Sequence, residues 1–134
     1  MRKQPKVDVL PSGLAVIDGK PYPIVYKVVT KEMQSLGLRG NTNILTYPVL
    51  NWLTLPPKEI VHGDGGWRGV GGIWAARTKS KAYGLEDHMI KTHGIPVSIY
   101  LAAARNILYT NSYRVKMGAI FLIQQLESRL ESKI

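Results

Sequence analysis

The sequence predicts an α+β fold: a single compact domain with an N-terminal β-hairpin, a mixed or antiparallel sheet and two or three helices. Strand patterns come first in the chain, and strand and helix patterns then mix without the regular β-α-β alternation of a doubly wound sheet. The chain has 134 residues, which is near the commonest size of one domain and allows it to bury roughly two-thirds of its unfolded surface. We therefore expect residues 1–134 to form one domain, in which the composition allows disorder only at residues 1–6.

The N-terminal third has the pattern of a β-hairpin. Short apolar strands are expected at residues 7–10 and 14–17, on either side of a turn at residues 11–13. The dipeptide Asp18-Gly19 follows, and it favours a two-residue hairpin turn because both turn positions adopt positive φ. Residues 20–30 are then expected to form the partner strand.

Three later segments carry helical signals. Thr30 can cap a short helix over residues 31–36. Thr78 or Ser80 can cap a second helix that runs to about Lys91, with Gly94 beyond its end. A final helix is expected where apolar residues recur at helical spacing, at Ala119, Ile123, Leu126 and Leu130. Further strands are expected at residues 73–76, 97–101 and 112–117.

Residues 40–72 form a long segment without a regular pattern. Proline and asparagine interrupt it repeatedly, and six of the ten residues from Gly63 to Gly72 are glycine. The glycines fit neither the Gly-x-x-x-x-Gly-Lys-Ser/Thr nor the Gly-x-Gly-x-x-Gly phosphate-binding pattern. Irregular segments of this length in a compact domain are typically functional or mobile, so we expect this Gly/Pro-rich region to face the working surface.

The chain is basic, with 18 Lys and Arg residues against 9 Asp and Glu residues and a formal net charge of +9. Such a surplus favours polyanionic partners such as nucleic acid, nucleotides or acidic lipid headgroups, and it also serves solubility alone. The absence of cysteine excludes disulfides and thiolate metal sites. No apolar run approaches the roughly 18 residues of a membrane span. We expect a soluble protein without membrane association, in the cytoplasm or another intracellular compartment.

No motif for catalysis or metal binding stands out. His88 and His93 are five residues apart, which is not the i, i+4 spacing that puts two imidazoles on one helix face. Glu86-Asp87 lies among lysines and is interpreted as a solvated helix face. No serine lies in a Gly-x-Ser-x-Gly elbow. We therefore predict no metal site and no catalytic residue, and we favour a binding protein over an enzyme.

Aromatic rings and cations gather in and after the glycine run. The candidate ligand-binding residues there are Trp67, Arg68, Arg77, Lys79, Lys81 and Tyr83. Planar rings can stack on a nucleobase or a nicotinamide while Arg and Lys bind phosphate. Trp74, between Ile73 and Ala75, is instead interpreted as a core residue of a buried strand.

Four segments together resemble a small protein family and, in their order, the ADP-ribosyltransferase-like fold. The segments are residues 25–28, 35–39, 71–78 and 107–115. The resemblance implies an NAD-contacting residue on an early strand, here Tyr26 or Arg39. It implies nicotinamide-supporting residues at Thr78, Ser80 or Tyr83. The late strand has Ser112-Tyr113-Arg114 where that fold carries a catalytic glutamate. NAD is therefore expected only if the resemblance holds, and otherwise no cofactor is expected.

Three classes of function follow from these observations. The leading one is noncovalent binding of a phosphate-bearing ligand, with nucleic acid as the first choice, through a basic and aromatic face. The second is an ADP-ribosyltransferase-like NAD-binding protein, active or degenerate. The third is a structural or assembly protein, a homo-oligomer included, that uses Trp52, Trp67 and residues 47–57 as its contact surface.

Overall fold

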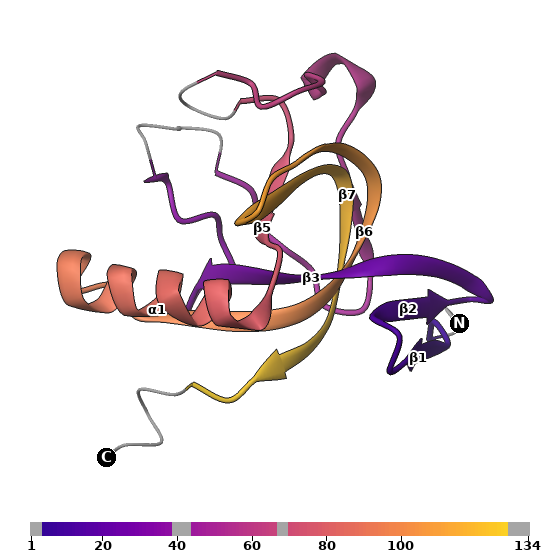
Figure 1. Ribbon diagram of the computed structural model, residues 1–134, viewed down its shortest axis with the longest axis horizontal. Helices are drawn as coiled ribbons and strands as arrows, with labels where there is room; N and C mark the ends of the chain where they lie inside the picture. The colour runs from indigo at the N-terminus through magenta and orange to yellow at the C-terminus, as the bar shows by residue number, and fades with distance from the viewer. Residues whose placement is uncertain (1–3, 39–43, 67–69, 129–134) are drawn as a thin grey trace.

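The computed structural model describes residues 4–38, 44–66 and 70–128, and within them the protein is mostly antiparallel sheet with a single α-helix (Figure 1). The strands are β1 (Val7–Val9), β2 (Leu14–Ile17), β3 (Lys20–Thr30), β4 (Trp52–Thr54), β5 (Ile73–Ala76), β6 (Val97–Thr110) and β7 (Arg114–Leu126). The helices are the one-turn 3-10 helix η2 (Pro57–Glu59) and α1 (Lys79–His93). The prediction of an α+β fold with two or three helices is therefore wrong.

Four strands pair in a closed circuit. β3 pairs with β6, β6 with β7, and β7 with β5, while β5 returns to β3 through the pair Tyr26 and Ala76. All of these pairings are antiparallel. β6 and β7 are the longest strands and bend strongly together, as Figure 1 shows, and their register shifts after Leu101 and after Ile107. The bend brings β5 and β3 to neighbouring positions, and a cavity lies beside them.

The N-terminal hairpin is confirmed. Ile17 pairs with Lys20, and the two residues between them, Asp18 and Gly19, have φ of 49° and 83°. The carboxylate of Asp18 also accepts a hydrogen bond from the backbone N–H of Lys6, at 3.0 Å. The turn is therefore fixed both by positive φ at its two central residues and by a side-chain hydrogen bond to the backbone of Lys6, just before β1.

Helix α1 is also confirmed, and of the two N-caps predicted for it, Thr78 and Ser80, Thr78 is the one that caps it. The side chain of Thr78 accepts a hydrogen bond from the backbone N–H of Lys81, and Gly94 ends the helix with φ of 66°. The interpretation of Glu86-Asp87 as a solvated face is wrong for Glu86, which is 1% exposed, whereas Asp87 forms an exposed ion pair with Lys91 at 3.7 Å. The helix therefore presents one carboxylate to the sheet that it covers.

Two predicted helices do not form. Residues 31–36 make a turn in which Gln34 forms an isolated bridge with Thr46, and Met33 has a positive φ of 65°. The helical spacing from Ala119 to Leu126 belongs to β7, in which every residue from Val115 to Leu122 is buried, and Leu130 lies outside the described residues. A strand covered on both faces loses its polar-apolar alternation, so its sequence pattern resembles that of a buried helix.

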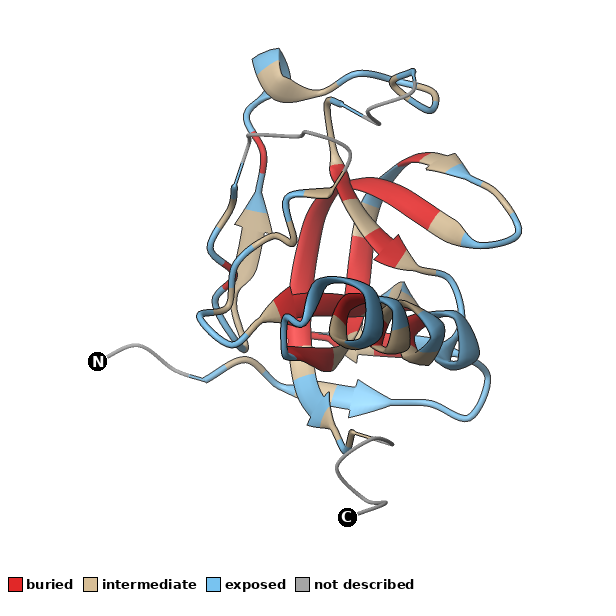
Figure 2. Cartoon of the chain, turned by 90° about the vertical axis from the view of Figure 1, so that its left-hand side faces the viewer, coloured by how far each residue is buried: buried red, intermediate tan, exposed pale blue. Residues whose placement is uncertain are grey.

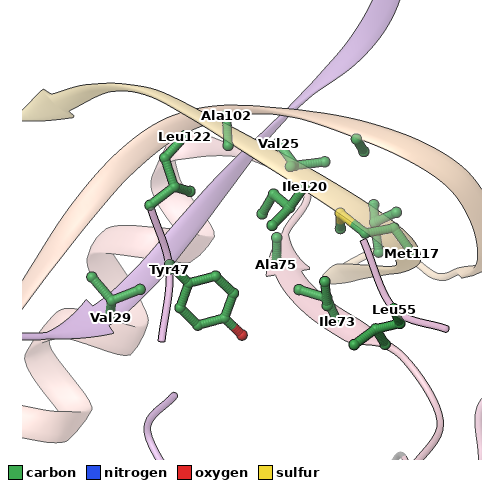
Figure 3. Packing of buried hydrophobic residues seen from close by; sticks show 12 residues of the cluster. Val25, Val29, Tyr47, Leu55, Ile73, Ala75, Ala102, Met117, Ile120 and Leu122 are labelled. Carbon is green, nitrogen blue, oxygen red and sulfur yellow. The ribbon is translucent and has the colours of Figure 1, made fainter. Parts of the chain in front are cut away.

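The core lies between the bent strands, where Figure 2 shows the buried stretches. Figure 3 shows its packing: Ile73 and Ala75 of β5 lie near Met117 and Ile120 of β7. The strand predicted at residues 73–76 is confirmed. The core assignment of Trp74 is wrong, because the alternation of β5 buries Ile73 and Ala75 and leaves Trp74 half-buried.

None of the helices in the described ranges is long and apolar enough to cross a lipid bilayer.

Candidate functional site

A cavity of about 400 Å³ lies between β3, β5, the first turns of α1 and three irregular segments. We name it the β3–β5 pocket. The irregular segments approach it from residues 35–38, 44–47 and 70–72, so the Gly/Pro-rich region does border the cavity. Its described lining residues are Lys27, Val28, Ser35, Leu36, Gly37, Leu38, Ile44, Leu45, Tyr47, Val70, Gly71, Gly72, Ile73, Trp74, Ala75, Ala76, Lys81, Leu85, Tyr113 and Arg114.

Three cations line the pocket, and none of the lining residues in the described part of the chain is acidic. The cations come from three different elements: Lys27 from β3, Lys81 from α1 and Arg114 from the start of β7. Like charges that converge on a partly desolvated cavity repel one another, so a bound anion relieves an unfavourable interaction. The electrostatics of the lining therefore favour an anionic ligand.

Lys27 is the most buried of these three cations, with only 8% of its surface exposed. Its Nζ donates a hydrogen bond of 2.6 Å to the backbone carbonyl of Trp74 and lies 4.8 Å from the centroid of the Tyr47 ring. Because an ammonium has three N–H donors, this bond leaves Lys27 able to donate further. The side chain thus joins β3 to β5 and still carries a positive charge to the cavity.

Aromatic rings hold the other two cations. The guanidinium of Arg114 lies 3.9 Å from the centroid of the Trp74 ring, and the ammonium of Lys81 lies 4.3 Å from that of Tyr113. The Trp74 ring also contacts Tyr109 edge to face, with the ring centroids 5.9 Å apart. Contacts of this kind orient a cation without neutralising it. Tyr113 is 61% exposed, so its ring is available to a ligand.

The rest of the lining is largely apolar. Leucine and isoleucine side chains from the irregular segments and α1 cover it, at Leu36, Leu38, Ile44, Leu45 and Leu85. The hydroxyls of Ser35 and Tyr47 lie 3.2 Å apart and form a hydrogen bond beside them. A cavity with an apolar wall and a few fixed polar groups is typical of a site for an organic ligand.

The structure brings one predicted site residue, Lys81, into the lining. Arg77 lies next to the pocket: its backbone N–H donates to the carbonyl of Tyr113 at 3.0 Å, and its Nη1 donates to the carbonyl of Asn111 at 3.3 Å. Lys79 is exposed at the first position of α1 and does not line the cavity.

Two predicted tyrosines belong to a different part of the fold. Tyr26 and Tyr83 pack against the buried cluster beneath α1, and the hydroxyl of Tyr83 donates to the carbonyl of Glu127 at 2.9 Å. Neither lines the β3–β5 pocket. The remaining predicted residues, Trp67, Arg68 and Arg39, lie outside the described residues.

Sequence reasoning missed Lys27 and Arg114 as ligand-binding candidates. A signal for Lys27 was present, because a lysine within the apolar run from Val25 to Val29 is buried if the run is a central strand. Arg114 carried no comparable local signal, since its approach to Trp74 depends on the pairing of β5 with β7. Sites built from separate strands are visible only once the strand pairing is known.

The glycine run has a structural role around Lys116. The Nζ of Lys116 donates hydrogen bonds to the backbone carbonyls of Val61, at 2.7 Å, and Gly63, at 3.1 Å, and the residue is fully buried. A Cβ on Gly72 would lie 2.6 Å from Cγ of Lys116, so the backbone approaches this side chain too closely for any larger residue. Burial lowers the pKa of Lys116, and the charge of Asp64 opposes that effect. The run thereby fixes the wall at Gly71 and Gly72.

No group of three or more His, Asp or Glu side chains in the described ranges is placed to hold a metal ion. No protein-family model, curated protein or solved structure matches the chain, so the fold and the geometry of the pocket carry the functional argument.

Proposed function

We propose that the protein binds a phosphate-bearing ligand noncovalently in the β3–β5 pocket, and that this ligand is nucleic acid. The observation that carries the proposal is the lining itself: Lys27, Lys81 and Arg114 converge on one cavity, and the described lining holds no carboxylate. Phosphate oxygens accept charge-assisted hydrogen bonds from Arg and Lys more strongly than neutral acceptors do.

The cations of the lining match the phosphate of a nucleotide, and its aromatic and apolar residues match the base. Arg114 and Lys81, both in contact with aromatic rings, offer cations to a phosphate. A base can stack on the exposed ring of Tyr113 and pack against the apolar side chains of the lining. A volume of about 400 Å³ lies at the lower end of the range for small-ligand sites, roughly 300–1,000 Å³.

A single strand suits such a pocket better than a duplex. In a duplex the bases are stacked and paired, whereas an unpaired nucleotide can turn its base onto a protein ring. We therefore propose that single-stranded nucleic acid binds more tightly than double-stranded nucleic acid of the same length.

The alternative of an NAD-using transferase has no comparable support. Tyr113 and Arg114, on the segment where the ADP-ribosyltransferase-like order would place a glutamate, line the pocket with a phenol and a guanidinium. Neither group can act as the carboxylate that such chemistry uses. Binding without catalysis is therefore the function that we propose.

Fluorescence anisotropy of a labelled oligothymidylate measures the proposed binding directly. We expect binding at low ionic strength and an affinity that falls steeply as salt is added, because the contacts are mainly to phosphate. A salt-insensitive complex would contradict the proposal. So would the absence of binding to every single-stranded and double-stranded probe at low ionic strength.

A further inference from the structure

A second cavity, of about 310 Å³, shares no lining residue with the β3–β5 pocket. We name it the Glu86 cavity. It lies where the buried face of α1 meets the start of β6 and the end of β7. Its lining is mainly polar and comprises Lys31, Glu86, Val97, Ser98, Ile99, Gln125, Leu126, Glu127 and Ser128.

Glu86 is the unusual residue of this cavity. It is 1% exposed, and its Oε1 has no hydrogen-bond partner among the described residues. A carboxylate removed from water without a donor is costly, and such groups in proteins are ordinarily paired or hydrogen-bonded. A hydrogen-bond donor that enters the cavity would therefore stabilise the Glu86 carboxylate.

The described lining holds two carboxylates, Glu86 and Glu127, against one cation, Lys31, and Lys31 donates no hydrogen bond to Oε1 of Glu86. The surplus of negative charge favours a small cationic donor. Ser98 accepts a hydrogen bond from the Nε2 of Gln125 at 3.4 Å, which orients both polar side chains at the cavity. Val97 and Ile99, on either side of Ser98, are buried and provide apolar contact. A metal ion is a poor match, because no third acidic or histidine ligand accompanies Glu86 and Glu127 in the described structure.

We propose that the Glu86 cavity binds the ammonium group of a small primary amine. In this site Oε1 of Glu86 accepts a charge-assisted hydrogen bond from the ammonium, and the alkyl part of the amine lies against Val97 and Ile99. The bond supplies the donor that the buried carboxylate lacks. This site is independent of the proposed nucleic-acid site, and its test does not involve nucleic acid.

The test compares butylammonium with tetramethylammonium, which has the same charge but no N–H donor. Titrations are followed by NMR, through the shifts of the backbone amides of Ser98 and Ile99. We expect saturable shifts with butylammonium, with a dissociation constant on the order of 1 mM or tighter, and none with tetramethylammonium. Equal binding of the two cations would overturn the proposal, and so would the absence of saturable shifts with butylammonium.

Two variants assign the effect to Glu86. The isosteric variant Glu86→Gln removes the charge and should weaken butylammonium binding by about tenfold or more. Asp87→Asn removes the neighbouring, exposed carboxylate and should leave binding unchanged. Thermal unfolding of Glu86→Gln verifies that it is folded, and we expect it to be at least as stable as wild type, because an unpaired buried charge is lost. Unchanged butylammonium binding by folded Glu86→Gln would overturn the proposal.

Discussion

The guanidinium of Arg114 lies 3.9 Å from the centroid of the Trp74 ring. Both residues line the β3–β5 pocket, and their meeting depends on β5 pairing with β7, which places Trp74 opposite Lys116 and Ala76 opposite Arg114. The contact therefore links the sheet pairing to the chemistry of the pocket. Trp74 can make this contact because the alternation of β5 turns Ile73 and Ala75, rather than Trp74, into the core.

The position of Trp74 predicts a modest cost for its removal. Trp74→Ala should lower the free energy of unfolding by on the order of 1–2 kcal/mol, because the side chain is half-buried. Ile73→Ala, one residue earlier and buried, should cost about 2–5 kcal/mol. Urea unfolding of both variants gives the comparison. A larger loss for Trp74→Ala than for Ile73→Ala would contradict the assignment of the two side chains to opposite faces of β5.

The glycine run offers a matched pair of substitutions. Gly65 and Gly66 have similar φ, 74° and 76°, but a Cβ on Gly65 would meet the backbone of Val70, whereas a Cβ on Gly66 meets no atom within 4 Å. Gly66→Ala should lower the free energy of unfolding by about 1 kcal/mol, because alanine is strained at positive φ. Gly65→Ala should lower it by at least about 1 kcal/mol more, because the new Cβ also overlaps the backbone of Val70. Equal unfolding free energies for the two variants would show that close approach at Gly65 is unimportant.

Lys116 should make stability depend on pH. Because burial lowers its pKa in the folded protein below the usual 10.5, the unfolded chain binds more protons than the folded one between those two pKa values. Stability from this group therefore rises as pH increases through that window. The difference in unfolding free energy between wild type and Lys116→Met should shift in favour of wild type as the pH is raised toward 10.5. A shift in the opposite direction would contradict the burial of a charged Lys116.

The hairpin turn gives a test of backbone conformation alone. Gly19 has φ of 83° and open space where a Cβ would lie, so Gly19→Val should cost on the order of 1–2 kcal/mol purely because of positive φ. Gly19→Asn should cost clearly less, since asparagine tolerates this region. Melting temperatures of the two variants test this prediction, and equal melting temperatures would count against it.

Local signals in the sequence predicted local structure well. The Asp18-Gly19 turn and the Thr78 and Gly94 caps of α1 depend on residues close together in the chain, and each is present. What the sequence did not reveal was the length of β6 and β7. The run Ala102-Ala103-Ala104 favours helix by propensity, yet it lies in β6, because its pairing with β3 and β7 outweighs that preference.

The residues of the pocket also divide into those indicated by nearby residues and those brought together by strand pairing. Lys81 was predicted from its place near aromatic residues, and it lines the cavity. Tyr26 and Tyr83 have aromatic rings that could stack on a ligand, but both pack beneath α1. This placement depends on which face of β3 and of α1 each side chain occupies, and the local sequence did not reveal it. The apolar run around Lys27 could indicate that this lysine is buried, but its meeting with Trp74 and Arg114 depends on contacts between residues far apart in the chain, which no spacing pattern reveals.

The affinity of Arg114→Gln for a labelled single-stranded oligonucleotide, with Lys79→Gln as control, tests the central claim most directly. Both variants remove one positive charge, but Arg114 lines the pocket and Lys79 is exposed outside it. If the pocket binds phosphate, Arg114→Gln weakens binding by about tenfold or more, and Lys79→Gln changes it only slightly. Equal losses in the two variants would mean that binding follows net charge alone and would contradict the pocket as the site.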